Sequence, residues 1–250
     1  MAIVNRTPDS FYRPGVTWDP AAALDRVHAV VAEGADIVDI GGVPARPGDD
    51  VDVREEIRRT VPFIAAVRDA YPDLVISVDT WRHEVGREAC AAGADLLNDS
   101  WGGWDPRLAE AAARAGAGIV CSHAGGQRPR TRPFRVAYDD VVRDVLRGTL
   151  GLAARALEAG VAQDRILIDP AHDFGKNTWH SLEITRRLAE LAATGWPVLA
   201  GAMRGLAPAV EVLYCDDPFG VSYLVACLRP GTRPDDGPDD GDTRSWPVRG

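Results

Sequence analysis

Short apolar runs alternate with longer stretches of helical periodicity, and this alternation restricts the fold more than any other feature. The apolar runs are rich in β-branched residues and are predicted strands, at 2–5, 36–40, 74–79, 95–99, 118–123, 165–170 and 197–201. The stretches between them are predicted helices, at 19–34, 52–71, 83–92, 105–116, 137–160 and 179–195. Near-continuous apolar strands are typical of a parallel sheet buried on both faces.

Seven repeats of this kind in 250 residues predict an α/β fold, a (β/α)₈ TIM barrel. A doubly wound open sheet is the alternative, and it fits less well because no G-x-G-x-x-G follows the first strand. The first strand is expected to be short, since Met1 lies inside it. The seventh and eighth βα units are expected to be irregular or incomplete, because the run 220–228 could be a strand or a helix.

Composition bounds the domain organisation and the environment. We expect one domain over residues 1–229 and a disordered tail over 230–250, where Pro, Gly, Asp and Arg dominate. The formal net charge of −9 argues against a general nucleic-acid or anionic-membrane binder. The four cysteines show neither metal-site nor disulfide spacing, no apolar run reaches membrane-spanning length and no leader pattern is present, so a reducing cytoplasm is expected.

Polar residues stand at or just beyond the ends of the predicted strands. In a TIM barrel the active site forms at the carboxyl ends of the strands. The residues found there are Asn5, Asp39, Arg46, Asp79, Asn98, Asp99, His123, Asp169 and Lys176. Any one of them could be a helix cap, a turn residue or a hydrogen-bonded core histidine. Their occurrence together indicates a functional site.

The chemistry of these side chains suggests two kinds of ligand. Asp79, Asn98 and Asp169 offer acceptors and an amide donor, which would suit a flat heterocycle with N–H and amide edges. Asn5, Arg46 and N–H groups at loop–helix junctions would suit an anion at the rim. Asn5 beside an acidic group would also suit Mg²⁺ that is bound largely through a phosphate ligand.

Other motifs are incomplete. Gly175-Lys176 is followed by Asn177 and lacks the preceding glycine of a P-loop. His83-Glu84 lacks the second histidine of H-E-x-x-H, and the sequence shows no histidine–cysteine cluster for zinc. The nucleophile motif G-x-S-x-G is also absent from the sequence.

Six ordered segments carry a family resemblance: 1–12, 34–48, 76–81, 92–103, 119–126 and 166–177. The most specific are N-x-T-P-D-S-F, which begins at Asn5, and D-P-x-x-x-F-G-K, which begins at Asp169. Over residues 1 to about 204 the chain resembles dihydropteroate synthase of the folate pathway. In detail it is similar to the divergent second copy of that synthase found in actinobacteria, whose synthase activity is in question.

The resemblance implies a TIM-barrel transferase that is usually a cytoplasmic homodimer. It would join 6-hydroxymethyl-7,8-dihydropterin diphosphate to 4-aminobenzoate, giving dihydropteroate and diphosphate. In the family, diphosphate leaves first with the help of Mg²⁺, and the aniline nitrogen attacks the pterin-methyl cation that remains. Small-molecule substrates are therefore the expected partners, with neither nucleic acid nor membrane among them.

The resemblance also assigns roles to residues of this sequence. Asp79 and Arg46 match catalytic positions, and Asn5 matches the metal position. The pterin-binding positions are matched by Asp79, Asn98, Asp169 and Phe174. The positions near diphosphate and aminobenzoate are matched by Asn5, Arg46 and Arg204.

The sequence departs from the family pattern at two loops. The second loop of the family usually reads G-G-E-S-T-R-P-G, whereas residues 41–48 read GGVPARPG, with Val43, Pro44 and Ala45 at the changed positions. Past the seventh strand, the family reads serine, arginine, lysine, whereas this chain reads Met203, Arg204, Gly205. The lost hydroxyls and the lost cation would otherwise act on the diphosphate, the pterin and the aminobenzoate.

Two further departures follow. Asp173 replaces a glycine of the sixth loop, and the R-x-H of the family's last strand has no equivalent. A reading-frame shift or truncation after Arg204 would explain the change in composition, and translating the other frames of the gene would test it. These departures predict weakened or lost synthase activity. The alternatives are a non-catalytic pterin- or anion-binding paralogue and, less favoured, a folate-dependent methyltransferase.

Overall fold

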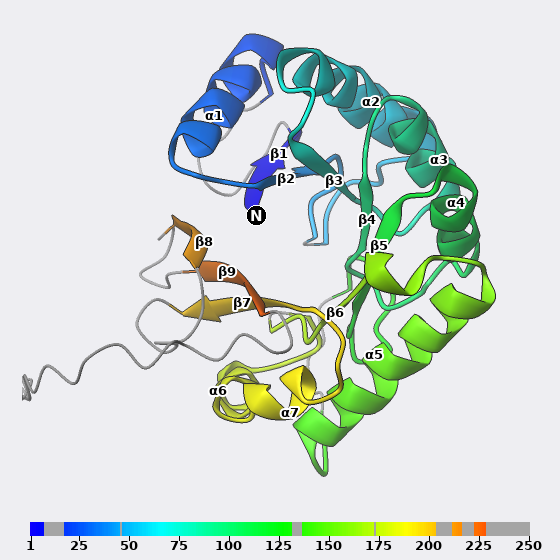
Figure 1. Cartoon of the computed structure of the whole chain (residues 1–250), viewed down its shortest axis with the longest axis vertical. Coiled ribbons are helices and arrows are strands. Elements are labelled where there is room, and N and C mark those ends of the chain that lie inside the picture. Colours follow the sequence, from blue (N-terminus) through cyan, green and yellow to red (C-terminus); the bar gives the residue numbers. More distant parts are fainter. Residues whose placement is uncertain are drawn as a thin grey trace, which may run out of the picture.

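Strands and helices alternate along the chain as the apolar pattern predicts (Figure 1). The computed structural model describes residues 1–7, 18–45, 47–131, 137–172, 174–203, 212–216 and 223–228. The first seven strands are β1 (Ala2–Asn5), β2 (Ile37–Gly41), β3 (Val75–Asp79), β4 (Leu96–Asp99), β5 (Gly118–Ser122), β6 (Ile166–Asp169) and β7 (Val198–Met203). The helices are α1 (Pro20–Ala32), α2 (Val53–Ala70), α3 (His83–Ala91), α4 (Arg107–Ala115), α5 (Val141–Glu158), α6 (Thr178–Arg186) and α7 (Leu188–Ala192), with a short 3₁₀ helix at Gln163–Arg165.

The strands β1 to β7 form one parallel sheet in sequential order. The sheet curls, and helices α1 to α5 follow one another in an arc around its outer face (Figure 1). A doubly wound sheet would reverse its strand order partway across, and this sheet does not. The architecture is therefore the TIM-barrel type that the sequence predicts.

The end of the sheet departs from that type. Strand β9 (Tyr223–Leu228) pairs antiparallel with β7, and β8 (Val212–Asp216) pairs antiparallel with β9. The run 220–228 thus contributes a strand rather than a helix, and the predicted irregularity of the last units is confirmed. Strands β1 and β8 are the two ends of the sheet as described. The predicted tail, 230–250, lies outside the described residues.

The helix ends follow from local sequence. The side chains of Asp19 and Asp52 accept hydrogen bonds from backbone N–H groups in the first turns of α1 and α2, at 2.9 and 2.8 Å. Gly34, Gly93 and Gly116, which the sequence places just after helices, have left-handed φ angles of 93°, 109° and 65°. A side chain at these positions would be strained, so these glycines end their helices.

One helix prediction needs correction. The stretch 179–195 was predicted as a single helix, but α6 and α7 are separate helices that meet at Arg187. Its backbone leaves the helical region, with φ −108° and ψ 20°. Its guanidinium contacts Asp140 at 3.0 Å and Glu190 at 2.6 Å. The contact with Asp140 holds the junction against the start of α5, and the contact with Glu190 holds the first turn of α7.

The apolar residues form two clusters. The larger one lies between the sheet and the helices and includes Ile40, Ile64, Leu97 and Ile168. The smaller one lies on the opposite face of the strands, inside the curl; its members are Met1, Ile37, Leu96, Val120, Leu167 and Leu199. Among the described helices, none has both the length and the apolar composition needed to cross a membrane.

Candidate functional site

A layer of polar side chains lies above the inner apolar cluster, at the carboxyl ends of the strands. Residues two apart in a strand point to the same face. Asp39 therefore faces inward with Ile37, Asn98 with Leu96, and Asp169 with Leu167. We call this set the polar layer; it consists of Asn5, Asp39, Ser77, Asp79, Asn98 and Asp169. The strand periodicity alone brings four of the predicted site residues to one end of the curled sheet.

Asp39 is the centre of this layer. Its carboxyl group is buried and accepts hydrogen bonds from the Ser77 hydroxyl at 2.5 Å and from Nδ2 of Asn98 at 3.1 Å. The amide of Asn98 is thereby fixed with its oxygen turned the other way. That Oδ1 is buried and has no hydrogen-bond partner within the described part of the chain. It is an acceptor available to an N–H group of a ligand.

Asp79 and Asn5 meet across Gly41. The register pairs Asn5 with Gly41 and Gly41 with Asp79 on successive strands. A Cβ atom on Gly41 would lie 2.9 Å from Oδ1 of Asn5 and 3.8 Å from Oδ2 of Asp79. The other oxygen of Asp79 accepts a 2.6 Å hydrogen bond from the Ser100 hydroxyl. Glycine at position 41 therefore leaves room for these two oxygen-bearing side chains to face the same space.

Burial changes the protonation of the acids in this layer. Burial first, and the neighbouring Asp39 charge second, raise the pKa of Asp79 to about 8. Burial also raises the pKa of Asp39, against hydrogen bonds from Ser77 and Asn98 that lower it. At neutral pH the Asp79 carboxyl is largely protonated and can donate as well as accept a hydrogen bond. Such a group suits a heterocycle edge on which donors and acceptors alternate.

The loop after β6 brings Asp169 and Phe174 to the same end of the sheet. One Asp169 oxygen accepts the Ala171 N–H at 2.7 Å, which fixes the start of the loop. The Phe174 ring meets Trp101 edge to face, with ring centroids 4.9 Å apart. Trp101 in turn meets Trp81 at 6.3 Å. The predicted pterin aromatic is therefore part of an aromatic series across the loops that follow β3, β4 and β6.

The ammonium group of Lys176 is hydrogen-bonded to the backbone around the loop that follows β6. Its ammonium donates to the backbone oxygens of His123, Ala171 and Phe174 at 2.8, 2.9 and 2.8 Å. It is also the only lysine of the sequence. These bonds tie the loop after β6 to the end of β5, which is a structural task.

Two other polar strand ends also have structural tasks. Asp99 accepts the backbone N–H groups of Trp101 at 3.3 Å and Gly103 at 2.8 Å, and so shapes its own turn. His123 contacts Asp144 of α5 at 3.0 Å. Burial, with a contribution from Lys176, lowers the pKa of His123 to about 4, so its ring is neutral. Both residues fit the cap and core interpretations better than a ligand-binding one.

The second loop is anchored from across the barrel mouth. Nε of Arg130 donates to the backbone oxygen of Pro44 at 3.1 Å, and Nη1 donates to that of Asp49 at 2.6 Å. Val43 is buried, and Ala45 is exposed with no hydroxyl to offer. The predicted site residues Arg46 and Arg204 lie outside the described residues, as do Asp173 and Gly205.

The structure shows where the predicted site residues lie relative to one another. Asn5, Asp79, Asn98 and Asp169 are brought to one end of the sheet, as expected. Asp39 was expected among the polar strand ends without an assigned role, and Ser77 and Ser100 were not expected there. The two-residue period of a strand could have found Ser77, because Ser77 and Asp79 lie on the same face of β3. The same period places Asp39 on the face of β2 that carries Ile37.

The oxygen donors around Gly41 bear on the Mg²⁺ that the family resemblance implies. Asn5 offers an uncharged amide oxygen, and the raised pKa of Asp79 makes its carboxyl a weak ligand at neutral pH. This donor set fits an ion that is held mainly by the phosphates of its ligand, with Asn5 as the protein contribution. It does not fit a metal that stays bound without that ligand.

Comparisons with known proteins agree with this geometry. The family model described as pterin binding enzyme matches residues 1–205. A Mycobacterium tuberculosis protein named inactive dihydropteroate synthase 2 is 60% identical over 203 residues, which are 80% of this chain and 64% of that protein. The chain therefore spans just under two thirds of the length of that relative.

Two further relatives carry the name without the word inactive. A dihydropteroate synthase of Streptococcus pyogenes is 39% identical over 206 residues, covering 82% of this chain and 74% of that one. The crystal structure of the Yersinia pestis dihydropteroate synthase with a sulfonamide drug complex superposes with a TM-score of 0.76 at 35% identity. It covers 82% of this chain and 73% of that chain.

Proposed function

The chain belongs to the pterin-binding family of dihydropteroate synthases, and we propose that it is a pterin-binding paralogue without synthase turnover. Its ligand would be a dihydropterin, bound as the diphosphate with Mg²⁺ or without the diphosphate. In this proposal the chain keeps the residues that would bind the pterin, which we call the recognition half of the site. It has lost residues that would act on the diphosphate and the aminobenzoate during the reaction. The relatives named inactive support this proposal over an active synthase.

The recognition half is the polar layer. The free Oδ1 of Asn98 would accept an N–H of the heterocycle, and the protonated Asp79 carboxyl could donate and accept at the same edge. Asp169 of β6 would offer a further acceptor to the heterocycle, and Phe174 would contact a face of its ring. Burial strengthens each of these bonds, because water does not compete for the same groups.

The observation that carries the loss of turnover is the state of Lys176. The family pattern places a lysine past the seventh strand, and this sequence has Gly205 there. The only lysine of the sequence donates to three backbone oxygens and cannot move to the missing position without breaking them. Ala45 and Pro44 also replace hydroxyl-bearing residues of the second loop.

The size of the expected loss follows from these contacts. Each lost charge-assisted hydrogen bond costs about 1.5–3 kcal/mol. If that energy acts in the transition state, each loss slows the reaction about 10- to 100-fold. The lysine, the loop threonine and the C-terminal arginine together would then account for several orders of magnitude.

Calorimetry and a coupled enzyme assay test the proposal together. We expect the full chain to bind 6-hydroxymethyl-7,8-dihydropterin diphosphate with Mg²⁺ and to form no dihydropteroate from 4-aminobenzoate. Asp79→Ala should weaken binding at least 10-fold, whereas the exposed Asp36→Ala should not. Turnover that Asp79→Ala abolishes would establish the synthase instead. Absence of pterin binding in the folded protein would contradict both.

A weak synthase is the second candidate, because Asn5 and Asp79 are retained at the metal and pterin positions. Ala45→Thr with Gly205→Lys distinguishes the two candidates. For a weak synthase these changes should raise the rate that the wild type already has. For the non-catalytic paralogue, turnover should appear only in the double variant. Homodimerisation remains an expectation, which size-exclusion chromatography with light scattering checks.

A further inference from the structure

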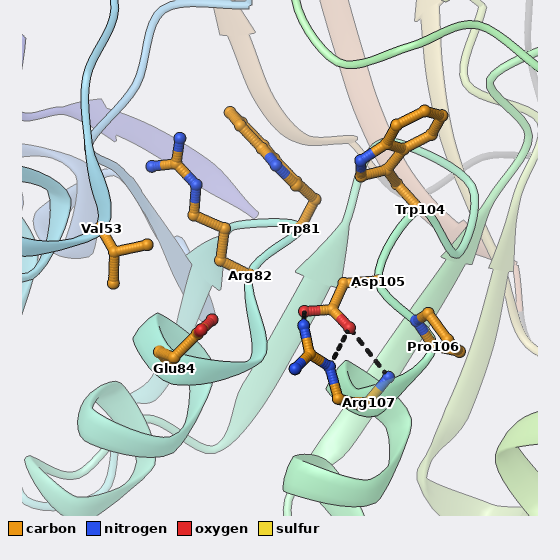
Figure 2. Close-up of a pocket in the computed structure, with 8 residues that line it drawn as sticks. All are labelled: Val53, Trp81, Arg82, Glu84, Trp104, Asp105, Pro106 and Arg107. Atoms are coloured by element: carbon orange, nitrogen blue, oxygen red, sulfur yellow. Dashed lines mark hydrogen bonds and ion pairs between the residues drawn. The ribbon is translucent and has the colours of Figure 1, made fainter.

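A cavity of about 340 Å³ lies outside the polar layer, at the loops that follow β3 and β4. Figure 2 shows Trp81 and Trp104 standing on these two loops, with Asp105 and Arg107 beneath them. Trp104 is half exposed. The cavity is thus an open space between two helix starts rather than part of the barrel interior.

His83, Glu84 and Asp105 meet beside this cavity. Nδ1 of His83 lies 2.7 Å from Oδ2 of Asp105 and 2.9 Å from Oε2 of Glu84. His83 and Glu84 begin α3, whereas Asp105 comes from the loop before α4, 21 residues after Glu84. The ligand atoms of the three side chains lie within 4.8 Å of one another.

In this cluster Asp105 supplies a third metal-ligating side chain beside the His83-Glu84 pair. The H-E-x-x-H motif needs a second histidine four residues after the first, and that position is Arg87. The third ligand comes from the neighbouring βα unit instead. We propose that His83, Glu84 and Asp105 bind one divalent transition-metal ion of the zinc class at the edge of the cavity.

The donor types support this class of ion. One imidazole nitrogen and two carboxylate oxygens are ligands that Zn²⁺ takes in three-residue sites, where the fourth position stays open. An imidazole ligand is more suited to zinc than to magnesium or calcium. The open position would face the cavity between Trp81 and Trp104, where a water molecule or a small anionic ligand could occupy it.

The distances require only a small adjustment. Tetrahedral zinc ligands at about 2.0–2.2 Å from the metal lie roughly 3.3–3.5 Å from each other. The two carboxylates would therefore retreat from Nδ1 by about half an ångström. The Glu84 side chain is 41% exposed and free to do so. Arg107 holds the Asp105 carboxylate with Nε on Oδ1 at 2.9 Å and Nη2 on Oδ2 at 3.2 Å, and the His83 backbone N–H also donates to Oδ2 at 3.3 Å. These bonds would orient Asp105 as a ligand, and the metal would take the place of the Nη2 contact on Oδ2.

Metal binding at Nδ1 of His83 needs the lone pair of that nitrogen. The neutral ring would therefore bind as the tautomer that carries its proton on Nε2.

Zinc titration of the tag-free chain tests the site. We expect one Zn²⁺ per chain by isothermal titration calorimetry, and a Co²⁺ absorption spectrum of mixed nitrogen and oxygen ligation. His83→Gln and Glu84→Gln should each weaken Zn²⁺ binding at least about 10-fold, because even changes beyond the ligands cost 10- to 100-fold. Glu88→Gln is the matched control, since Glu88 lies on α3 with 42% exposure and should leave binding unchanged.

Two results would overturn the proposal. One is a wild-type chain that binds no Zn²⁺, and the other is Glu84→Gln binding it as tightly as Glu88→Gln does. Asp105→Asn is a secondary variant, because Asp105 also bridges two helix starts and its loss could impair folding. Asn5→Ala should leave Zn²⁺ binding unchanged, which separates this site from the proposed pterin site.

Discussion

The polar layer and the second loop belong to the same barrel mouth, but they keep their family's chemistry to different degrees. In the polar layer, Asp39, Ser77 and Asn98 hold one another in place, and Asn98 still has an acceptor to offer. In the second loop, Val43, Pro44 and Ala45 replace acidic and hydroxyl-bearing residues of the family pattern. Arg130 ties the loop down through backbone oxygens.

This contrast shows which part of a site can change without loss of the fold. The polar layer is built from strand residues whose hydrogen bonds also satisfy buried groups, so a substitution there costs stability. In the second loop Val43 is buried, but Pro44 is only half-buried and Ala45 is exposed. Substitutions at exposed positions are usually tolerated within about 0.5 kcal/mol. Catalysis can therefore be lost at the loop while the recognition surface persists.

The largest expected effect concerns pH. The pKa of Asp79 rises from 3.8 in the unfolded chain to about 8 in the fold, so the folded protein binds one proton more between these values. The stability from this group is complete below about pH 4 and is lost as the pH rises through about 8. The free energy of unfolding should fall over this window by up to about 1.4 kcal/mol per pH unit.

Asp79→Asn tests this directly, because an amide cannot ionise but can still accept from Ser100. Thermal unfolding followed by circular dichroism from pH 5 to 8 should show a smaller loss of stability in the variant. Part of the slope should remain, since burial raises the pKa of Asp99 to about 7 as well. An exposed substitution, Asp36→Asn, should keep the wild-type slope. Equal slopes for Asp79→Asn and wild type would contradict a buried, protonated Asp79.

Asp39→Ala should have the next largest effect. It leaves the Ser77 hydroxyl and the Asn98 amide without their buried acceptor, and each such loss costs about 1–3 kcal/mol. We expect the free energy of unfolding in urea to fall by about 2–4 kcal/mol. Asp39→Asn keeps one acceptor and should lie between this variant and wild type. Unchanged stability in Asp39→Ala would mean that the network contributes nothing to the fold.

Lys176→Met should cost about 1.5–3 kcal/mol, as expected for charge-assisted hydrogen bonds to backbone oxygens. The methionine keeps the length and the apolar stem of lysine but removes its three donated bonds. Differential scanning calorimetry would measure the loss. Arg87→Met is the control, because that side chain is 70% exposed and, in the part of the chain that the structure describes, its ion pair is with its sequence neighbour Glu88. If both variants lose a similar amount of stability, the structural role assigned to Lys176 is wrong.

Much of this architecture could be predicted from the sequence because it depends on local pattern. Apolar runs located the seven parallel strands, and helical periodicity located the helices between them, which end at or beside Gly34, Gly93 and Gly116. The polar strand ends Asn5, Asp79, Asn98 and Asp169 were predicted because parallel strands bring their carboxyl ends to one edge. Each of these predictions uses residues that are close in sequence or repeat in every unit.

The remainder depends on contacts between distant residues. The role of Asp39 follows from its register with Ser77 and Asn98, 38 and 59 residues away. The cluster at His83 needs Asp105 from the next βα unit, and spacing along one helix cannot show it. The antiparallel direction of β9 could not be predicted either, because an apolar run has the same composition whether it pairs parallel or antiparallel.

The smallest expected effect is at the second loop and concerns its mobility more than its stability. Arg130→Ala removes the donors to the oxygens of Pro44, which is half-buried, and Asp49, which is exposed. Because neither bond is fully buried, the free energy of unfolding should change by less than about 1 kcal/mol. Hydrogen–deuterium exchange at the backbone amides of residues 48–50 should nevertheless become faster, because this segment loses its anchor. Arg128→Ala, an exposed arginine two residues earlier, should leave that exchange rate unchanged. If Pro44 alone fixes the loop, Arg130→Ala will also leave it unchanged, and the anchoring assigned to Arg130 would be wrong.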